Sequence, residues 1–278
     1  MRTSRPFKGR RFPSPVILLC VRWYLAYSLS YRDLQEMMAE RGIQVDASTI
    51  YRWVQAYAPE LDRRIRRRLK PTWGDWHVDE TYIRIRGVWH YLYRAVDAAG
   101  QTVDFLLSAR RDTLAAMAFF ENAILRPHND SPETLVVDRN PAYPVALELL
   151  KKSGHFSPTA NLITGRALNN LIEQDHRRIK RLVRPGLGFK KFDTARRTLQ
   201  GYETMSMIRK GQVEQGEGME RPSRAMSRTF SGWLLDRVRE RPIFAIFEIC
   251  NRTDQGMPWD SRSSNGKERW THWKSQHG

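Results

Sequence analysis

The fold is decided by one stretch of the chain, Trp76-His77-Val78-Asp79-Glu80-Thr81-Tyr82-Ile83-Arg84-Ile85. Its Val, Thr, Tyr and Ile residues favour a β-strand. Gly87 predicts a turn, and residues 88–96 (VWHYLYRAV) predict a second strand. Another turn is predicted at Ala99-Gly100, followed by a third strand over residues 102–109. The stretch therefore opens an antiparallel meander of three strands.

Helices and one more strand follow this meander. Four apolar residues at helical spacing predict a helix over residues 113–125: Leu114, Met117, Phe120 and Ile124. Residues 134–138 (TLVVD) form a short apolar run that ends in an acid, which is typical of a buried parallel strand. Two later helices are predicted over residues 144–152 and about 167–182. The order is β-β-β-α-β-α-(β)-α, which indicates an α/β fold.

Three acids occupy informative places in this order. Asp79 lies in the first strand, Asp138 at the carboxyl end of the fourth, and Glu173 on the last helix. The first and fourth strands can be neighbours in a mixed sheet, so their acids can converge at one edge. A helix packed across that edge can bring in the third acid. Taken singly, each acid is better explained as an edge or salt-bridge residue, so the prediction depends on the three together.

Clustered carboxylates repel one another and usually need cations. Hard oxygen ligands select Mg²⁺ or Mn²⁺, and two such ions about 4 Å apart can bind both the attacking and the leaving oxygen in phosphoryl transfer.

The other acids are expected to have different places. Glu80 is expected on the opposite face of the strand from Asp79, and Asp175 at the surface or in a pair between helices. Turns or solvated edges are the expected places of three further acids: Asp75, Asp97 and Asp104.

Residues 1 to about 70 are predicted to be helical. Ser30 caps a first helix that Gly42 ends, and Asp46 caps a second helix from Ala47 to Tyr57, after which Pro59 follows. Two short helices with a Gly-containing turn match a helix-turn-helix. The outer face of the second helix, which would meet base edges, carries Ser48, Thr49, Tyr51, Arg52 and Gln55.

Among these outer-face residues, Thr49, Arg52 and Gln55 are our candidate DNA contacts. An ordinary helical hairpin, whose apolar faces only form a core, explains the same pattern about equally well. The charge favours DNA, because 47 Lys and Arg against 30 Asp and Glu give a net charge of +17, which suits a polyanionic partner. The arginine-rich run over residues 63–68 is by default a solvated face or linker, and it could also bind phosphates.

The composition argues against several other classes of protein. Two cysteines and no Cys/His cluster support neither a zinc site nor a disulfide framework. The most apolar early stretch, residues 16–21, is far shorter than the roughly 20 residues that span a bilayer. No small-residue cleavage site follows it, so no signal peptide is predicted. We therefore expect a protein of the reducing cytosol.

Longer motifs resemble one known family. They are Trp76-x-x-Asp79-Glu80-Thr81-Tyr82, Gly87-x-Trp89-x-Tyr91-Leu92-Tyr93-Arg94-Ala95, Arg110-Arg111-Asp112 and Asn169-Asn170-x-Ile172-Glu173-Gln174-Asp175-His176-Arg177-x-Ile179-Lys180. In this order they closely resemble bacterial insertion-sequence transposases of the DDE class, in the IS-six family. The resemblance implies a ribonuclease-H-like catalytic core, two Mg²⁺ or Mn²⁺ ions, and a catalytic and metal-binding triad of Asp79, Asp138 and Glu173.

The resemblance also implies a cytoplasmic bacterial protein that is associated with the nucleoid when bound to DNA, and it implies the partners. These are the terminal inverted repeats of an element, the target DNA, and a second copy of the chain, because two DNA ends must be brought together. Lys180 stands seven residues after Glu173 and shares its helix face, as Arg177 does. We expect these two residues and Arg181 to contact DNA, although charge pairs along a helix would explain them too.

Three regions are predicted: a helical DNA-binding region over residues 1–70, a catalytic domain over residues 71–212, and a partly disordered tail over residues 213–278. Three other functions remain open at this point. A helix-turn-helix regulator with an inactive core would not cleave DNA with metal. A nuclease that only hydrolyses would not join a 3′-hydroxyl end, and a structural basic protein would need no acid triad.

Overall fold

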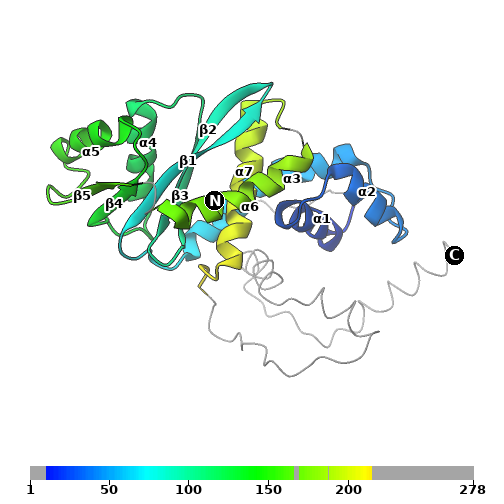
Figure 1. The fold of residues 1–278 in the computed structure, drawn as a ribbon. Coiled ribbons are helices and arrows are strands. Elements are labelled where there is room, and N and C mark those ends of the chain that lie inside the picture. Colours follow the sequence, from blue (N-terminus) through cyan, green and yellow to red (C-terminus); the bar gives the residue numbers. More distant parts are fainter. Residues whose placement is uncertain (1–10, 166–168, 187, 215–278) are drawn as a thin grey trace. The chain divides into compact units, whose positions relative to one another are not determined.

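A five-stranded mixed sheet forms the centre of the computed structural model, which describes residues 11–165, 169–186 and 188–214 (Figure 1). In chain order the strands are β1 (Trp76–Ile85), β2 (Val88–Asp97), β3 (Thr102–Ser108), β4 (Thr134–Val137) and β5 (Asn161–Thr164). The spatial order is β3-β2-β1-β4-β5. The first three strands are antiparallel, while β4 runs parallel to β1 and β5 parallel to β4. The predicted meander and the predicted pairing of the first and fourth strands are confirmed.

Helices cover both faces of this sheet. On one face, α4 (Thr113–Ile124) and α5 (Ala142–Lys152) pack on sheet residues that include Trp76, Val78 and Tyr93. On the other face lie α6 (Asn170–Val183) and α7 (Phe192–Arg209), drawn in yellow-green and yellow (Figure 1). This arrangement is the ribonuclease-H-like fold that the resemblance implied.

The predicted helix over residues 113–125 is confirmed as α4, but not all of the apolar residues that predicted it are buried. Leu114 is 69% exposed, whereas the buried residues are Ala115, Ala116, Phe119, Phe120 and Ala123. Both faces of this helix are apolar, so helical spacing alone could not decide which one packs on the sheet. The small side chains let the helix approach the strands closely.

A buried ion-pair network joins the sheet to α6 and α7. Arg94 of β2 has a side chain that is 1% exposed and donates two hydrogen bonds to Glu203 of α7, at 2.6 and 2.9 Å. It also donates to Asp175 of α6, which accepts from Lys210 Nζ at 2.9 Å. Asp175 therefore links helices, as expected, but as a member of a largely buried network rather than a surface pair.

Three helices precede the sheet, α1 (Ser14–Ala26), α2 (Tyr31–Ala39) and α3 (Ala47–Ile65). The predicted cap of α2 is confirmed, since Ser30 Oγ accepts from the backbone N–H of Asp33 and Asp33 accepts from Ser30 N–H. Gly42 has a positive φ of 71° after the helix. The predicted end of α3 near Tyr57 is wrong, because the helix continues through Pro59 to Ile65.

Contacts between α3 and α7 explain why α3 is long. Gln55 Nε2 donates to Thr198 Oγ1 at 2.8 Å, and Thr204 Oγ1 donates to Asp62 Oδ1 at 3.2 Å. A Cβ at Gly201 of α7 would lie 2.5 Å from Leu25 Cδ2 of α1, so the glycine permits close packing of α7 on α1 as well. The stability that α3 gains by packing against α7 outweighs the loss of the backbone hydrogen bond that Pro59 cannot make.

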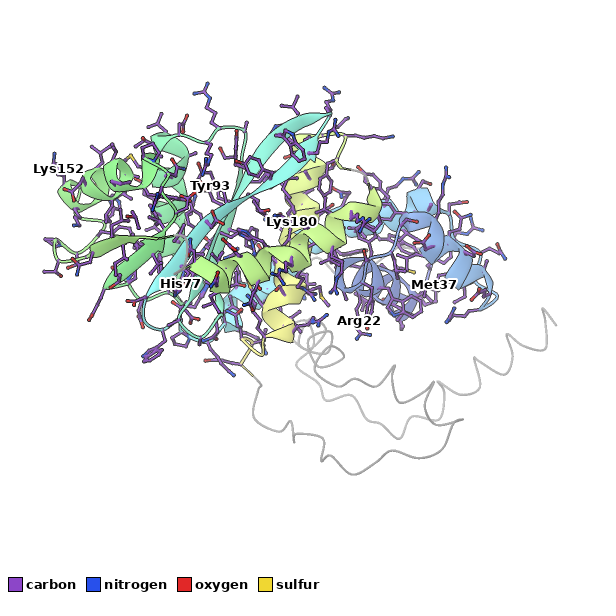
Figure 2. All side chains as sticks on the ribbon, in the orientation of Figure 1. Arg22, Met37, His77, Tyr93, Lys152 and Lys180 are labelled. Carbon is purple, nitrogen blue, oxygen red and sulfur yellow. The ribbon has the colours of Figure 1, made fainter. Side chains whose placement is uncertain are left out.

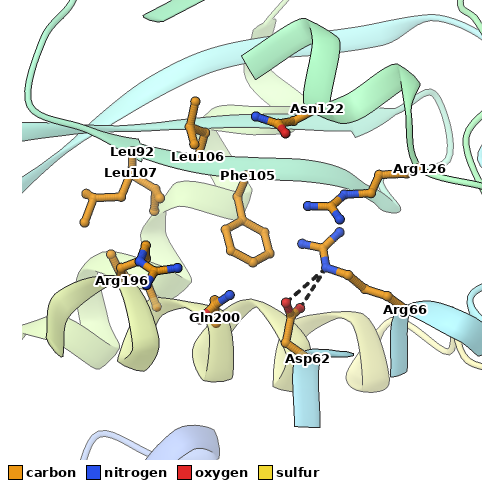
Figure 3. A pocket seen from close by; sticks show the side chains of 11 residues that line it. Asp62, Arg66, Leu92, Phe105, Leu106, Leu107, Asn122, Arg126, Arg196 and Gln200 are labelled. Carbon is orange, nitrogen blue, oxygen red and sulfur yellow. Dashed lines mark hydrogen bonds and ion pairs between the residues drawn. The ribbon is translucent and has the colours of Figure 1, made fainter. Parts of the chain in front are cut away.

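The end of α3 leads into a charged pocket (Figure 3). Asp62 pairs with Arg66 at 3.0 Å, and Asp104 of β3 accepts from Arg66 at 2.8 Å and from Arg126 at 2.9 Å. Asp104 is fully buried, so its expected place at a turn or solvated edge is wrong. The expectation for the arginine-rich run is wrong for Arg66, whose side chain is only 10% exposed. Asp97 does serve a turn, since it accepts from the backbone of residues 99 and 101.

The described chain continues just past the predicted catalytic domain. Val213 forms an isolated bridge with Leu69, and Glu214 N–H donates to the carbonyl of Arg68 at 2.8 Å. The remainder of the predicted tail lies outside the described residues. Among the helices that the structure describes, none combines the length and apolarity needed to cross a membrane.

Candidate active site

Two of the three predicted acids meet where β1 and β4 part. The parallel register pairs Val78 with Val137 as its last step, so the next residues, Asp79 within β1 and Asp138 just after β4, lie at the same level. Carboxylate oxygens of Asp79, Glu80 and Asp138 all lie within 4.8 Å of one another. The expected convergence of Asp79 and Asp138 at one edge is confirmed.

Glu173 lies in the first turn of α6, with an exposed side chain. The start of this helix is fixed on the sheet, because the buried Asn169 donates from Nδ2 to the carbonyl of Val78 at 2.9 Å. Glu173 is outside the group of oxygens within 4.8 Å, but its charge is near enough to act on the Asp79 carboxyl. The structure thus joins Asp79 and Asp138 and places Glu173 on the helix that packs beside them.

Glu80 is closer to these acids than strand alternation suggested. We expected it on the opposite face from Asp79, and its carboxylate nevertheless belongs to the same group of oxygens. Only 6% of Glu80 is exposed. It accepts from Asn140 Nδ2 at 2.9 Å and from Arg111 Nη2 at 3.2 Å. Its two oxygens are therefore already engaged by protein groups.

Arg111, which lies between β3 and α4, places a positively charged side chain among these acids. Its Nη2 contacts Glu80 Oε2 and also Asp138 Oδ2, the latter at 2.9 Å. Burial would lower the pKa of Arg111, but Glu80, Asp138 and the more distant Tyr82 outweigh it and raise this pKa. Arg111 stays charged and offsets part of the repulsion between the two acids. Arg111 is part of the Arg110-Arg111-Asp112 motif, but we predicted no role for it from the sequence.

Asn140 fixes the loop that follows β4. Its backbone N–H donates to Asp138 Oδ1 at 2.9 Å, and its Oδ1 accepts from the N–H of Ala142 at 3.0 Å, at the start of α5. With its Nδ2 bonded to Glu80, the buried Asn140 holds two acids and one helix start together. Its position two residues after Asp138 was the only sequence signal, since Asn side chains commonly bond backbone groups nearby.

Asp79 is the most perturbed acid of the group. Burial raises its pKa to about 7, against the lowering effect of the Glu80 N–H that donates to it at 2.8 Å. The charges of Glu80, Asp138 and Glu173 contribute to this raised pKa after burial, which is the largest cause. Like charges that crowd together in this way favour a bound cation.

His176 of α6 is another residue for which the sequence pattern predicted no role. Its Nδ1 lies 3.6 Å from Asp79 Oδ2, and its side chain is 4% exposed. Burial, with added repulsion from Arg94 and Lys180, lowers the pKa of His176 to about 3, so the ring is neutral at pH 7. Its place on the buried face of α6, between Ile172 and Ile179, was a readable signal.

The donor set fits hard divalent cations. Asp79, Asp138 and Glu173 offer only carboxylate oxygens, the ligands that Mg²⁺ and Mn²⁺ prefer. Asp79 Oδ2 has a neutral imidazole beside it rather than a competing cation. Asp138 keeps 30% of its side chain exposed despite Arg111. Divalent cations could therefore be held by Asp79 and Asp138, with Glu173 approaching from α6.

The predicted DNA contacts have different surroundings. Arg52 is exposed on α3 and Thr49 is half-buried, whereas Gln55 is 9% exposed and bonded to Thr198. The predicted place of Gln55 on the outer face is therefore wrong, because α7, a helix that the sequence pattern had not indicated, covers it. On α6, the three predicted contacts are all exposed: Arg177, Lys180 and Arg181 (Figure 2 labels Lys180).

Known proteins are similar in sequence to most of this chain. The profile of a family described as "DDE domain" matches residues 74–212. The "Transposase for insertion sequence-like element IS431mec" of Staphylococcus aureus is 42% identical over 205 residues, which cover 73% of this chain and 88% of that protein. The "Transposase for insertion sequence element IS257 in transposon Tn4003", also of Staphylococcus aureus, is 41% identical over 205 residues with the same coverage.

Solved structures give weaker likenesses. The HTLV-2 integrase catalytic core domain in complex with magnesium (dimeric form) has a TM-score of 0.34 and 21% identity, covering 43% of this chain and 74% of that chain. The catalytic core domain of BIV integrase has a TM-score of 0.37 and 17% identity, covering 51% of this chain and 87% of that chain.

Proposed function

Since the chain belongs to the DDE transposases of bacterial insertion sequences, in the IS-six family, we propose that it cleaves the ends of an insertion sequence and joins their 3′-hydroxyl ends to target DNA. One observation carries this proposal. Asp79 within β1 and Asp138 at the end of the adjacent parallel strand β4 lie at the same level, and α6 brings Glu173 beside them. A protein that only binds DNA needs no such arrangement of acids.

The reaction consists of two phosphoryl transfers. In cleavage, a water oxygen attacks the phosphorus at the end of the element, the bond to the 3′-oxygen breaks, and the strand is left with a 3′-hydroxyl. In joining, that hydroxyl attacks a target phosphorus and the target's own 3′-oxygen leaves. Each step makes one phosphorus–oxygen bond, breaks another, and passes one proton from the attacking oxygen toward the leaving one.

Asp79, Asp138 and Glu173 are the residues that would hold two Mg²⁺ or Mn²⁺ ions. When bound, such ions activate the attacking oxygen and stabilise the leaving oxygen. The remaining residues keep the acids in place: Asn140 orients Asp138 through its backbone N–H, and His176 stays neutral beside Asp79. Arg111 supplies positive charge next to the position of a scissile phosphate.

DNA binding is divided between α3 and α6 in this proposal. Arg52 and Thr49 on the outer side of α3 read bases in double-stranded DNA, while Arg177, Lys180 and Arg181 on α6 contact phosphates near the cut end. Two ends must be held together, so the active form is a homodimer or a larger assembly. The substrate places the reaction on bacterial DNA in the cytoplasm.

The test uses DNA that carries the inverted repeats flanking the gene, with Mg²⁺ or Mn²⁺ added. Asp79→Asn, Asp138→Asn and Glu173→Gln should each abolish cleavage and joining while DNA binding and folding persist, because each keeps the shape and removes the charge. Asp193→Asn, at an exposed acid of α7, is the matched control and should act at the parental rate. A triad variant that joined ends at the parental rate would lose its assigned role. Cleavage without joining by the parental protein would instead favour a nuclease.

A further inference from the structure

The far half of the β1–β2 hairpin extends beyond the rest of the sheet. Pairing with β4 ends at Val78, and pairing with β3 reaches only as far as Tyr91. Residues 83–85 and 88–90 therefore form a two-stranded ribbon at the end of the hairpin (Figure 1). On β1, Asp79 lies four residues before this ribbon, so whatever the hairpin binds lies near the acids.

One face of the hairpin carries three aromatic rings, of which the Tyr82 ring contacts the other two. Tyr82 lies opposite Tyr91 in the register, with ring centroids 5.4 Å apart, and its ring lies 6.2 Å from that of Trp89. Tyr82 is 50% exposed and Trp89 is 55% exposed. We call these three residues the hairpin aromatic cluster. Single exposed rings are ordinary on protein surfaces, whereas a contiguous exposed group marks a binding surface.

The hairpin aromatic cluster adjoins the catalytic acids. Tyr82 is two residues after Glu80, so the two side chains share a face of the strand about 7 Å apart along it. On the same face, Arg111 contacts Glu80 Oε2 at 3.2 Å and Asp138 Oδ2 at 2.9 Å, so a positive charge lies beside the acids. A strand whose phosphate lies at the acids can therefore place a neighbouring base on these rings.

Charge indicates a nucleic acid as the occupant rather than another protein surface. Residues 81–96 contain no Asp or Glu. The guanidinium of Arg84 lies over the Trp89 ring, 5.8 Å from its centroid. Residues 188–190 border the same hairpin, because Phe189 N–H donates to the carbonyl of Arg84 at 2.9 Å. This contact brings the exposed Lys190 to the hairpin and continues the row of basic residues on α6.

We propose that the hairpin aromatic cluster stacks on unpaired bases of the DNA strand beside the phosphate that is cut. The inference rests on the proposed function, since it takes DNA as the substrate. Every base has a π-face, so stacking on Tyr and Trp tolerates any sequence, and a guanidinium over the ring adds to it. In a paired duplex the base faces are already covered by their neighbours. The surface therefore favours a locally opened end, in which the exposed bases exchange one stack for another.

Binding of single-stranded DNA tests the proposal without cleavage. The probe is a fluorescent oligothymidylate, titrated in the absence of divalent metal against full-length protein carrying Glu173→Gln. Adding Tyr82→Ala or Trp89→Ala should weaken binding by roughly 5- to 150-fold per lost stack, while Trp89→Phe retains most of it. Trp73→Ala is the matched control, because Trp73 is 73% exposed and lies outside the cluster. Binding to blunt duplex DNA should change little, and circular dichroism verifies folding.

A cleavage assay with two substrates completes the test. On a fully paired end, Trp89→Ala should cut more slowly than the parental protein, and mismatches that pre-open the flanking base pairs should reduce this defect. Equal weakening on single-stranded and duplex DNA would overturn the proposal, as would unchanged single-strand binding. Dissociation of a dimer by Trp89→Ala, with single-strand binding retained, would show an interface between copies and reject it. Failure of the parental protein to cut either substrate would reject the proposed function, while the binding titration would still decide the stacking.

Discussion

Replacing Asp175 by Asn probes the network that holds α6 on the sheet. In the native protein two cations, Arg94 and Lys210, face two anions, Asp175 and Glu203. Their side chains are between 0% and 20% exposed. Burial would raise the pKa of Asp175, but Arg94 and Lys210 outweigh it and lower this pKa, so the carboxylate is ionised. The Asn side chain keeps the shape and leaves one buried positive charge without a partner.

The expected loss in free energy of unfolding follows from the burial of these charges. Removing one partner of a buried ion pair costs about 3–5 kcal/mol. Asp175 is 14% exposed and Arg94 retains both hydrogen bonds to Glu203, so we expect the lower end, about 3 kcal/mol. The control is Asp193→Asn, which breaks a pair with Arg196 whose side chains are 64% and 50% exposed and should cost less than about 1 kcal/mol.

Equilibrium unfolding in urea, followed by circular dichroism, measures both variants as shifts of the midpoint. Adding Lys210→Met to Asp175→Asn restores the balance of charge, so the double variant should lose less stability than the sum of the single variants. A loss for Asp175→Asn no larger than that for Asp193→Asn would refute the reasoning, because it would show that the buried charges contribute nothing beyond shape.

Three further predictions concern other parts of the chain. Gly188→Ala should destabilise the protein by about 1–3 kcal/mol in thermal unfolding, because φ is +102° and the new Cβ would lie 2.8 Å from the carbonyl oxygen of Arg84. Ser30→Ala should cost about 1 kcal/mol in urea unfolding. The N–H and hydroxyl of Ser30 lower the pKa of Asp33, so the stabilisation is present above the unfolded pKa of about 4 and is lost as the pH falls through the lower folded value. Parent and Asp33→Asn should thus converge in stability once the pH has fallen below the lowered pKa of Asp33 in the folded protein. Arg52→Ala should reduce the preference for element ends over random DNA by about 1–3 kcal/mol in competition binding, and equal weakening on both DNAs would show a phosphate contact.

The strands and the paired acids could be predicted because they depend on local patterns. The Trp76–Ile85 strand agrees with its predicted bounds, since β-branched and aromatic residues run through it. Asp138 ends an apolar run, and the parallel pairing of that run with β1 follows from the order of elements. These features need only alternation, composition and chain order.

Other features depend on contacts between distant segments. Gln55 shows this clearly, because its spacing on α3 is that of an outer-face residue and only the packing of α7 buries it. Arg111 and Asn140 acquire their roles through Glu80 and Asp138, which come from different strands. Repeating patterns within one helix or strand contain no information on such partners.

The hydrogen bonds between α3 and α7 have a consequence for the DNA itself. Gln55 bonds to Thr198 and Asp62 to Thr204, so the helix proposed to read bases is attached at two points to a helix that also holds the sheet of the catalytic core. Because α3 is fixed in this way, its position sets the number of base pairs between the recognised sequence and the phosphate that is cut. One inserted base pair would turn the recognised bases by roughly 35° around the duplex axis, so the length of this interval should matter to the element as much as its sequence.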